Sequence, residues 1–255
     1  MKHARRLATR AFRASEGEFL AEGPQAVREA LTVAGATLEV FASSESSDQF
    51  GDLRDVAEAA GVPWHVVTDD VIAAITDTVQ TQGLVARCTA VDITLDALLA
   101  SHPEFLVVCA DIRDPGNAGA VIRCADAAGA DGVVFVGDSV DPFNPKSVRA
   151  TVGSVFHLPI VVDKAIPETL SRLRAGGMQV LAADGGGDLG LYDTELDLAA
   201  PTAWLMGNEA WGLPDEVRRL ADKAVAVPIY GRAESLNLAT AAAVCLYATA
   251  QARQK

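Results

Sequence analysis

Residues 205–214 read Leu-Met-Gly-Asn-Glu-Ala-Trp-Gly-Leu-Pro, and residues 227–238 read Val-Pro-Ile-Tyr-Gly-Arg-Ala-Glu-Ser-Leu-Asn-Leu. Both stretches place Gly and Pro where a strand is expected to end, and polar residues follow at once to open a helix. Turns of this kind bring backbone N–H and C=O groups to the surface, where a ligand can use them. Residues 114–123, which read Asp-Pro-Gly-Asn-Ala-Gly-Ala-Val-Ile-Arg, have the same arrangement. Three polar-tipped strand ends predict one composite site.

The sequence around these segments alternates apolar strands with helices. Apolar runs at 105–110 and 132–136 predict strands buried on both faces, with a helix at 116–128 between them. Further strands and helices follow as far as a terminal helix expected at 235–251. Such an alternation is typical of a parallel sheet covered by helices. The expected fold class is therefore α/β.

Shorter strands and helices over residues 15–90 predict a separate, smaller α/β layer at the amino-terminal end. The expected domains are residues 1–90, a linker at 91–103 and a larger domain at 104–255. A chain of 255 residues has room for two domains of ordinary size.

The charge of the chain is distributed unevenly. Its formal net charge of −13 argues at first against a nucleic-acid partner. Residues 1–13, however, hold five basic residues and no acidic one, so the remainder carries −18. A basic arm on an acidic body can still contact phosphates locally. A solvated helix face is an equally good interpretation of this arm taken alone.

The cysteines and histidines form no recognisable metal motif. They are scattered singly, without a C-x-x-C pair, at Cys88, Cys109, Cys124, Cys245, His3, His65, His102 and His157. Cys109 and Cys245 lie in apolar runs, which predicts small core residues in a reduced, cytoplasmic compartment. We expect no metal and no secretion leader. We also expect no membrane span, since the longest apolar stretch, 238–250, is shorter than the ~20 residues that a span needs.

Arg123 stands in an otherwise apolar helix and is expected to need a partner, because burying an unpaired charge is costly. Glu209 is the candidate partner. Asn117 lies six residues before Arg123, which places the two on different faces of that helix. On chemistry alone, a structural Arg–Glu pair is the favoured interpretation. Neither the G-x-G-x-x-G of a dinucleotide fold nor the G-x-S-x-G of a hydrolase occurs where it would be expected.

The order and spacing of the three segments resemble the SpoU/TrmH-type RNA ribose 2′-O-methyltransferases of the SPOUT class. The resemblance covers roughly residues 105–251. It rests on Asn117 and Arg123 in the first segment, Gly207-Asn-Glu with Gly212-Leu213 in the second, and Pro228 with Ser235-Leu-Asn237 in the third. Residues 17–83 resemble the small RNA-recognition domain, related to a ribosomal-protein fold, that many members carry.

This resemblance implies a deep trefoil knot in the carboxy-terminal strands, one of the rare exceptions to unknotted chains. It implies that S-adenosylmethionine lies bent in the knot and is held mostly by backbone groups. The residues expected to hold it are Leu205, Met206, Gly207, Val227, Ile229 and Leu236. It also implies a homodimer, to whose interface the apolar helix at 238–250 is a plausible contributor.

The implied reaction is methyl transfer to a ribose 2′-hydroxyl, and the implied catalytic residues are Arg123, Asn117, Glu209, Ser235 and Asn237. A guanidinium is essentially always protonated, so we expect Arg123 to stabilise the developing alkoxide while water or a phosphate takes the proton. Asn117 would orient Arg123 or the ribose, and Glu209 would pair with Arg123. Ser235 and Asn237 would hold the loop and the substrate.

By analogy, 23S ribosomal RNA is the expected substrate, because relatives that act on transfer RNA often lack the amino-terminal domain. Three alternatives stay open at this point. The chain could be a transfer-RNA 2′-O-methyltransferase, or a non-catalytic RNA-binding or ribosome assembly factor with the same fold. It could also be an α/β protein that binds another adenine nucleotide.

Overall fold

The computed structural model describes residues 1–76, 78 and 80–254. The chain forms two compact units, each described here by itself. One unit contains Met1–Val91 together with Asp141–His157, and the other contains Asp92–Val140 together with Leu158–Lys255. Three residues of the expected domains, Asp77, Val79 and Lys255, lie outside the described residues.

The second unit is built on a seven-stranded sheet with the order β7-β6-β5-β10-β8-β11-β9. Every pairing described in this sheet is parallel, which confirms the expected parallel α/β fold. Its strands are β5 (Phe105–Ala110), β6 (Gly132–Val136), β7 (Ile160–Val162), β8 (Gln179–Ala183), β9 (Leu189–Gly190), β10 (Thr202–Met206) and β11 (Lys223–Ala226).

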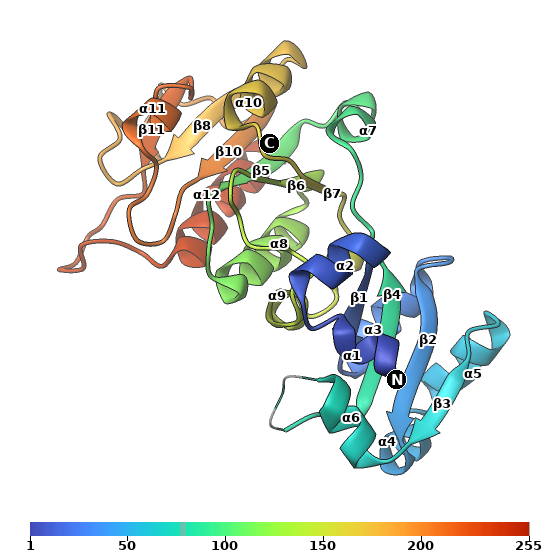
Figure 1. The fold of residues 1–255 in the computed structure, drawn as a ribbon. Coiled ribbons are helices and arrows are strands. Elements are labelled where there is room, and N and C mark those ends of the chain that lie inside the picture. The colour runs from blue at the N-terminus through green and yellow to red at the C-terminus, as the bar shows by residue number, and fades with distance from the viewer. Residues whose placement is uncertain (77, 79, 255) are drawn as a thin grey trace. The chain divides into compact units, whose positions relative to one another are not determined.

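Helices cover both faces of this sheet (Figure 1). They are α7 (Leu95–Ala100), α8 (Pro115–Ala128), α10 (Ile166–Ala175), α11 (Asp215–Arg218) and α12 (Leu238–Arg253). Helices α8 and α12 pack against each other and against the central strands, where the buried Trp204 indole donates to Thr249 Oγ1 at 2.9 Å. Apolar residues of α7, α10 and α11 join one core cluster with the strands.

Strand β10 lies between β5 and β8, and this position explains how the site is assembled. All five residues of β10 are buried, as expected of a central strand in a covered parallel sheet. Its last residue, Met206, pairs in register with Cys109 near the end of β5. The polar segments that follow β5 and β10 therefore leave the same edge of the sheet side by side.

Helix α12 begins at Leu238, three residues later than the expected 235. The side chain of Asn237 caps it, because its Oδ1 accepts from Ala239 N at 3.0 Å and from Thr240 N at 3.4 Å. Residues 227–237 consequently form a loop between β11 and α12 (Figure 1).

The first unit holds a four-stranded sheet with the order β1-β4-β2-β3, in which only the β2–β3 pairing is parallel among the described strands. The strands are β1 (Glu18–Glu22), β2 (Thr37–Ser43), β3 (Trp64–Val67) and β4 (Leu84–Thr89). The helices are α1 (Lys2–Arg6), α2 (Arg10–Glu16), α3 (Pro24–Thr32), α4 (Ser44–Gln49), α5 (Gly51–Ala59), α6 (Asp69–Ile75), α9 (Pro145–Thr151) and the 3₁₀ helix η1 (Ser154–Phe156).

The expected domain at 104–255 is not continuous in the structure, because residues 141–157 belong to the first unit. The carboxylate of Asp141 accepts from the buried guanidinium of Arg13, and Arg149 lies 2.9 Å from Glu22. The ring of Phe19 packs against Phe143, with centroids 4.9 Å apart. These contacts join residues more than a hundred positions apart, so a window of local sequence holds no sign of them.

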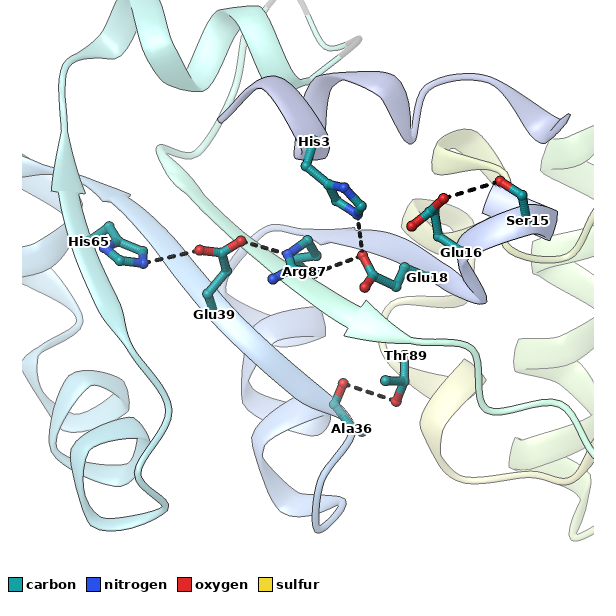
Figure 2. A network of polar contacts seen from close by, with 9 residues as sticks. All are labelled: His3, Ser15, Glu16, Glu18, Ala36, Glu39, His65, Arg87 and Thr89. Carbon is teal, nitrogen blue, oxygen red and sulfur yellow. Dashed lines mark hydrogen bonds and ion pairs between the residues drawn. The ribbon is translucent and has the colours of Figure 1, made fainter. Parts of the chain in front are cut away.

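A chain of ion pairs crosses the sheet of the first unit, and we call it the Arg87 network (Figure 2). Arg87 Nη1 donates to Glu18 Oε2 at 2.7 Å, and Arg87 Nε donates to Glu39 Oε1 at 2.6 Å. His3 lies 2.8 Å from Glu18, and His65 lies 3.1 Å from Glu39. One residue each from α1, β1, β4, β2 and β3 is thereby connected.

Candidate functional site

Three polar side chains, one from each expected segment, meet in a single hydrogen-bonded row that we call the Glu209 network. Glu209 Oε1 accepts from Asn117 Nδ2 at 3.2 Å. Asn117 Oδ1 in turn accepts from Asn237 Nδ2 at 3.0 Å. The row brings together residues 92 and 120 positions apart in the sequence. The composite site expected from the three strand ends is therefore formed by these side chains.

Glu209 is the centre of this arrangement. Besides Asn117, its carboxylate accepts from two backbone groups of the loop after β5, Asp114 N at 3.0 Å and Arg113 N at 3.1 Å. Hydrogen bonds to an ionised acceptor are stronger than neutral ones. Glu209 consequently fixes the loop at the start of α8 and the orientation of Asn117 together.

The start of α8 is held by a second carboxylate, that of Asp114. Its Oδ1 accepts from Asn117 N at 2.8 Å, so Asp114 is the N-cap and Asn117 the third residue of the helix. Pro115 occupies the first helical position, where its missing N–H leaves no bond unmade. The backbone of Asn117 is thus fixed by Asp114 while its side chain is fixed by Glu209 and Asn237.

Asn208 was not among the expected site residues, yet it joins the two neighbouring strand ends. It is 5% exposed, and its Nδ2 donates to the carbonyl of Asp111 at 2.7 Å. Its backbone exchanges two 2.9 Å hydrogen bonds with Gly212. Asp111 adopts a left-handed conformation, with φ of 54°, which Asp tolerates better than most residues. The signal that could have identified Asn208 is an amide placed directly after a buried strand.

Gly207 is required by a close approach within its own loop. A Cβ atom at this position would lie 2.5 Å from the carbonyl carbon of Gly212 and 2.7 Å from the nitrogen of Leu213. Real Cβ atoms do not come so close to backbone, so a side chain here would force the turn open. Gly207 was expected to help hold the cofactor. The structure gives a further reason for a glycine here, because only a residue without a side chain fits the turn that carries Glu209.

The expected pair between Glu209 and Arg123 was wrong. Among the described residues, the Glu209 carboxylate accepts from Arg113 N, Asp114 N and Asn117 Nδ2, and the side chain of Arg123 is exposed. Because Arg123 lies on the solvent side of α8, its charge keeps its hydration and requires no buried partner. Its neighbour Cys124 has Sγ 4.0 Å from the carbonyl oxygen of Ala239, so this part of α8 runs beside the start of α12.

The expected cofactor residues fall into two groups. Leu205, Met206 and Gly207 are buried at the end of β10. Val227, Ile229 and Leu236 lie in the loop between β11 and α12, where Ile229 is 38% and Leu236 36% exposed. Ser235 is exposed in the same loop, and the structure gives its side chain no hydrogen bond among the described residues.

Burial explains the state of the cysteines. It raises the pKa of the Cys88 thiol and of the Cys245 thiol to about 12, and it raises the pKa of Cys109 further. Thiols with such pKa values are protonated at neutral pH and are poor nucleophiles. Among the described residues, no group of three or more His, Cys, Asp or Glu side chains is arranged to hold a metal ion. No helix in the described part of the chain has the length and hydropathy of a membrane span.

Comparison with known proteins adds independent information. The model of the SpoU rRNA Methylase family matches residues 104–247, and that of the MRM3-like substrate binding domain matches residues 1–86. The chain is 34% identical to the 23S rRNA (guanosine(2553)-2′-O)-methyltransferase RlmP of Bacillus subtilis (strain 168), over 97% of this chain and 94% of that protein.

Two solved structures share the fold over nearly the whole length. The SpoU methyltransferase AviRb from Streptomyces viridochromogenes, in complex with the cofactor AdoMet, superposes with a TM-score of 0.88 at 28% identity and covers 100% of this chain and 97% of its own. The AdoMet-bound rRNA methyltransferase from Sinorhizobium meliloti gives 0.82 at 33% identity, over 98% of this chain and 93% of its own.

Proposed function

The chain belongs to the SpoU rRNA methylase family, and we propose that it transfers a methyl group from S-adenosylmethionine to a ribose 2′-hydroxyl of 23S ribosomal RNA. The observation that carries this proposal is the Glu209 network, which assembles the three segments at one sheet edge, where helix α8 with the exposed Arg123 begins. The rRNA-acting relative matches both units of this chain, which favours ribosomal over transfer RNA.

The loop at 227–236 suits a cofactor that is held by backbone groups. Among the described residues, no backbone–backbone hydrogen bond involves this stretch, so its N–H and C=O groups are available. The partly exposed side chains of Ile229 and Leu236 offer apolar surface for an adenine ring. We propose that these residues, with Val227 and the 205–207 segment, hold S-adenosylmethionine, which supplies an activated methyl group from its sulfonium.

Arg123 is the proposed electrostatic catalyst. During transfer, the bond from the methyl carbon to sulfur breaks while its bond to the ribose 2′ oxygen forms. The hydroxyl proton leaves to water or to an RNA phosphate, because a guanidinium is already protonated and accepts none. A solvent-exposed cation such as Arg123, which has no carboxylate partner among the described residues, is suited to stabilise the negative charge that grows on the 2′ oxygen.

The amides and the carboxylate are positioning residues in this proposal. Glu209 sets the loop before α8, Asn117 is held between Glu209 and Asn237, and Asn237 fixes the first turn of α12. The first turn of α8 and that of α12 are thereby locked together. We propose that the exposed Ser235, two residues before Asn237, contacts the substrate ribose or phosphate.

Three further features belong to the same proposal. We expect a trefoil knot, as the resemblance to the SPOUT class implies, in the sheet where β10 lies between β5 and β8. We expect a homodimer, as the resemblance implies, with the exposed Tyr247 of the alanine-rich helix α12 as a candidate contact. We expect the enzyme to act in the cytoplasm, where its ribosomal RNA substrate is made, with residues 1–90 recognising RNA and residues 104–255 carrying the catalytic site.

The decisive experiment is methyl transfer from radiolabelled S-adenosylmethionine to separated 23S, 16S and transfer RNA fractions. The expected result is label in 23S RNA at a linkage that resists alkaline cleavage, because 2′-O-methylation removes the nucleophile of alkaline hydrolysis. Label confined to transfer RNA would replace the proposed substrate. Cofactor binding without transfer to any RNA, including RNA from immature ribosomal particles, would favour the assembly-factor function instead.

A further inference from the structure

The basic amino-terminal segment is part of the folded first unit. Ala4 and Leu7 are completely buried in a core cluster that includes Leu20, Phe41 and Val85 of the sheet. His3 joins the Arg87 network through Glu18 (Figure 2). Helix α1 is therefore fixed on the sheet, so its outward side chains have defined positions.

One of the five expected cations of this segment is used internally. Arg13 is only 4% exposed, and its Nη1 donates to the carbonyls of Leu7 at 2.7 Å and Ala8 at 2.9 Å. Its Nε and Nη2 contact the carboxylate of Asp141 at 2.8 and 2.7 Å. Arg13 thus stabilises the turn between α1 and α2 and is unavailable to an external ligand.

Three other cations of this segment, Lys2, Arg5 and Arg6, have exposed side chains. Lys2 and Arg6 are four positions apart on α1 and so share one face of the helix. Since the rest of the chain carries a formal charge of −18, this face is a local positive surface on an acidic protein.

The guanidinium of Arg6 is already arranged for stacking. Its Cζ lies 3.9 Å from the centroid of the Phe12 ring, and the edge of Phe12 contacts His3 with centroids 5.0 Å apart. Beside this stack opens a shallow hollow of about 400 Å³, lined by Arg6, Thr9, Ala11, Phe12 and Ser15. Its size falls within the range of small-molecule sites, roughly 300–1,000 Å³.

We propose that this hollow binds an unpaired nucleotide of the RNA substrate, with its base stacked on the Arg6 guanidinium and its phosphates near Lys2 and Arg5. Single-stranded RNA is recognised by stacking of splayed bases on aromatic rings or guanidinium planes, next to cations that contact the backbone. Phe12 supports Arg6 from behind and keeps the guanidinium plane in place. The inference rests on the proposed function, because it assigns part of the RNA-recognition surface of the same enzyme.

The test separates stacking from charge. Binding of a fluorescent, mixed-sequence single-stranded RNA oligonucleotide and of 23S RNA would be measured for the full-length wild type, Arg6→Ala, Arg6→Lys and Lys2→Ala. Arg6→Ala should weaken oligonucleotide binding about tenfold, and Arg6→Lys should restore only a small part, since lysine has no planar group. Lys2→Ala should have a smaller effect and reduce the salt slope by about 0.7, as expected for one phosphate contact.

Arg54→Ala is the matched control, because it removes the same charge from an exposed helix of the same unit. It should change binding less than twofold. In methyl transfer, Arg6→Ala should raise the KM for 23S RNA and leave kcat at saturating RNA unchanged.

Three outcomes would overturn the stacking proposal: full rescue by Arg6→Lys, equal losses in Arg6→Ala and Arg54→Ala, or an effect of Arg6→Ala only on binding to phosphatidylglycerol vesicles. Failure of the wild type to methylate any RNA would instead refute the proposed function. In that case the dependence of oligonucleotide binding on Arg6 would still be decided by the same titrations.

Discussion

The Glu209 network and the Arg87 network are both built around carboxylates, but the carboxylates have different partners. In the Arg87 network two carboxylates neutralise one guanidinium, and all three side chains are at most 21% exposed (Figure 2). In the Glu209 network the carboxylate accepts from backbone N–H groups and an amide. It is therefore not the partner of Arg123. A part-buried arginine that is paired with carboxylates stabilises the fold, whereas the exposed Arg123 on the helix that Glu209 anchors retains a charge for a substrate.

The difference lies in what the carboxylate binds. Two backbone donors and one amide satisfy Glu209, so the network holds its shape without using a cation. Among the described residues, Glu18 and Glu39 accept from no backbone N–H group in this way and depend on Arg87 and the histidines. The comparison predicts catalytic losses from changes in the first network and losses of stability from changes in the second.

The largest effect is expected for Arg123→Ala. Removing a donor that stabilises a developing oxyanion costs roughly 10²- to 10³-fold in rate, and we expect a loss of this size in single-turnover methyl transfer to 23S RNA. Affinity for S-adenosylmethionine and the midpoint of urea unfolding should not change, because the side chain is exposed. Arg219→Ala, an equal loss of charge on an exposed residue after α11, should keep the wild-type rate. A near-normal rate for Arg123→Ala would remove Arg123 from the mechanism.

Arg123 also illustrates what the sequence could and could not predict. The alternation of apolar strands and helices was enough to predict the parallel sheet, and the three polar segments were enough to predict that Asn117, Glu209 and Asn237 meet. The sequence shows that an arginine interrupts an apolar stretch, but it does not show which face of the helix is covered. The predicted pair with Glu209 therefore failed, because the partners of Glu209 are backbone groups that carry no signal in the sequence.

The first unit was harder to predict for a related reason. Residues 1–13 look like a free basic arm, because five cations and no acid are visible in the sequence. The two apolar residues that anchor it, Ala4 and Leu7, do not form a recognisable pattern in so short a segment. The partner of Arg13 is Asp141, 128 positions away, and only the folded chain brings it near.

Glu209→Ala should have the next largest effect. It frees the N–H groups of Arg113 and Asp114 and the amide of Asn117, so the first turn of α8 loses its anchor. Misplacement of reacting groups by about 1 Å can cost on the order of 100-fold, and we expect a loss of ten- to hundred-fold in kcat. Glu209→Gln, which keeps one acceptor oxygen, should recover part of it.

Glu216→Ala removes an equally exposed carboxylate from α11 and serves as the control. The decisive readout is the split between kcat and the KM for 23S RNA, measured at saturating S-adenosylmethionine. A pure rise in KM with unchanged kcat would show that Glu209 binds RNA and does not position the catalytic segment.

Arg87→Met tests the other network. The change leaves Glu18 and Glu39 as neighbouring part-buried carboxylates without their shared cation, and breaking a buried ion pair is strongly destabilising. Because these groups keep some contact with solvent, we expect a loss of about 2 kcal/mol in the free energy of unfolding from urea titrations. The kcat of the folded protein should stay within twofold of wild type. Arg28→Met, which breaks an exposed pair with Asp52, should cost less than about 1 kcal/mol.

The pH dependence of stability gives the finest test of the same comparison. Burial raises the pKa of Glu18, but hydrogen bonds from Arg87 and His3, together with their charges, outweigh it and hold the pKa below 4.5. A carboxyl whose pKa is lower in the folded than in the unfolded state stabilises the fold above its unfolded pKa. That contribution is lost as the pH falls through the folded pKa.

The stability gap between wild type and Glu18→Gln should therefore be present above pH 4.5 and shrink steadily below it. We expect a gap of about 1 kcal/mol at neutral pH, because a hydrogen-bonded, part-buried pair is worth more than a surface pair. Urea midpoints across this range would measure it, with Glu58→Gln as the exposed control that shows a smaller gap at neutral pH. If the gap for Glu18→Gln stayed constant far below pH 4.5, the Arg87 network would not depend on the charge of Glu18. The proposed difference between the two networks would then be supported only by the effect of Arg123→Ala on catalysis.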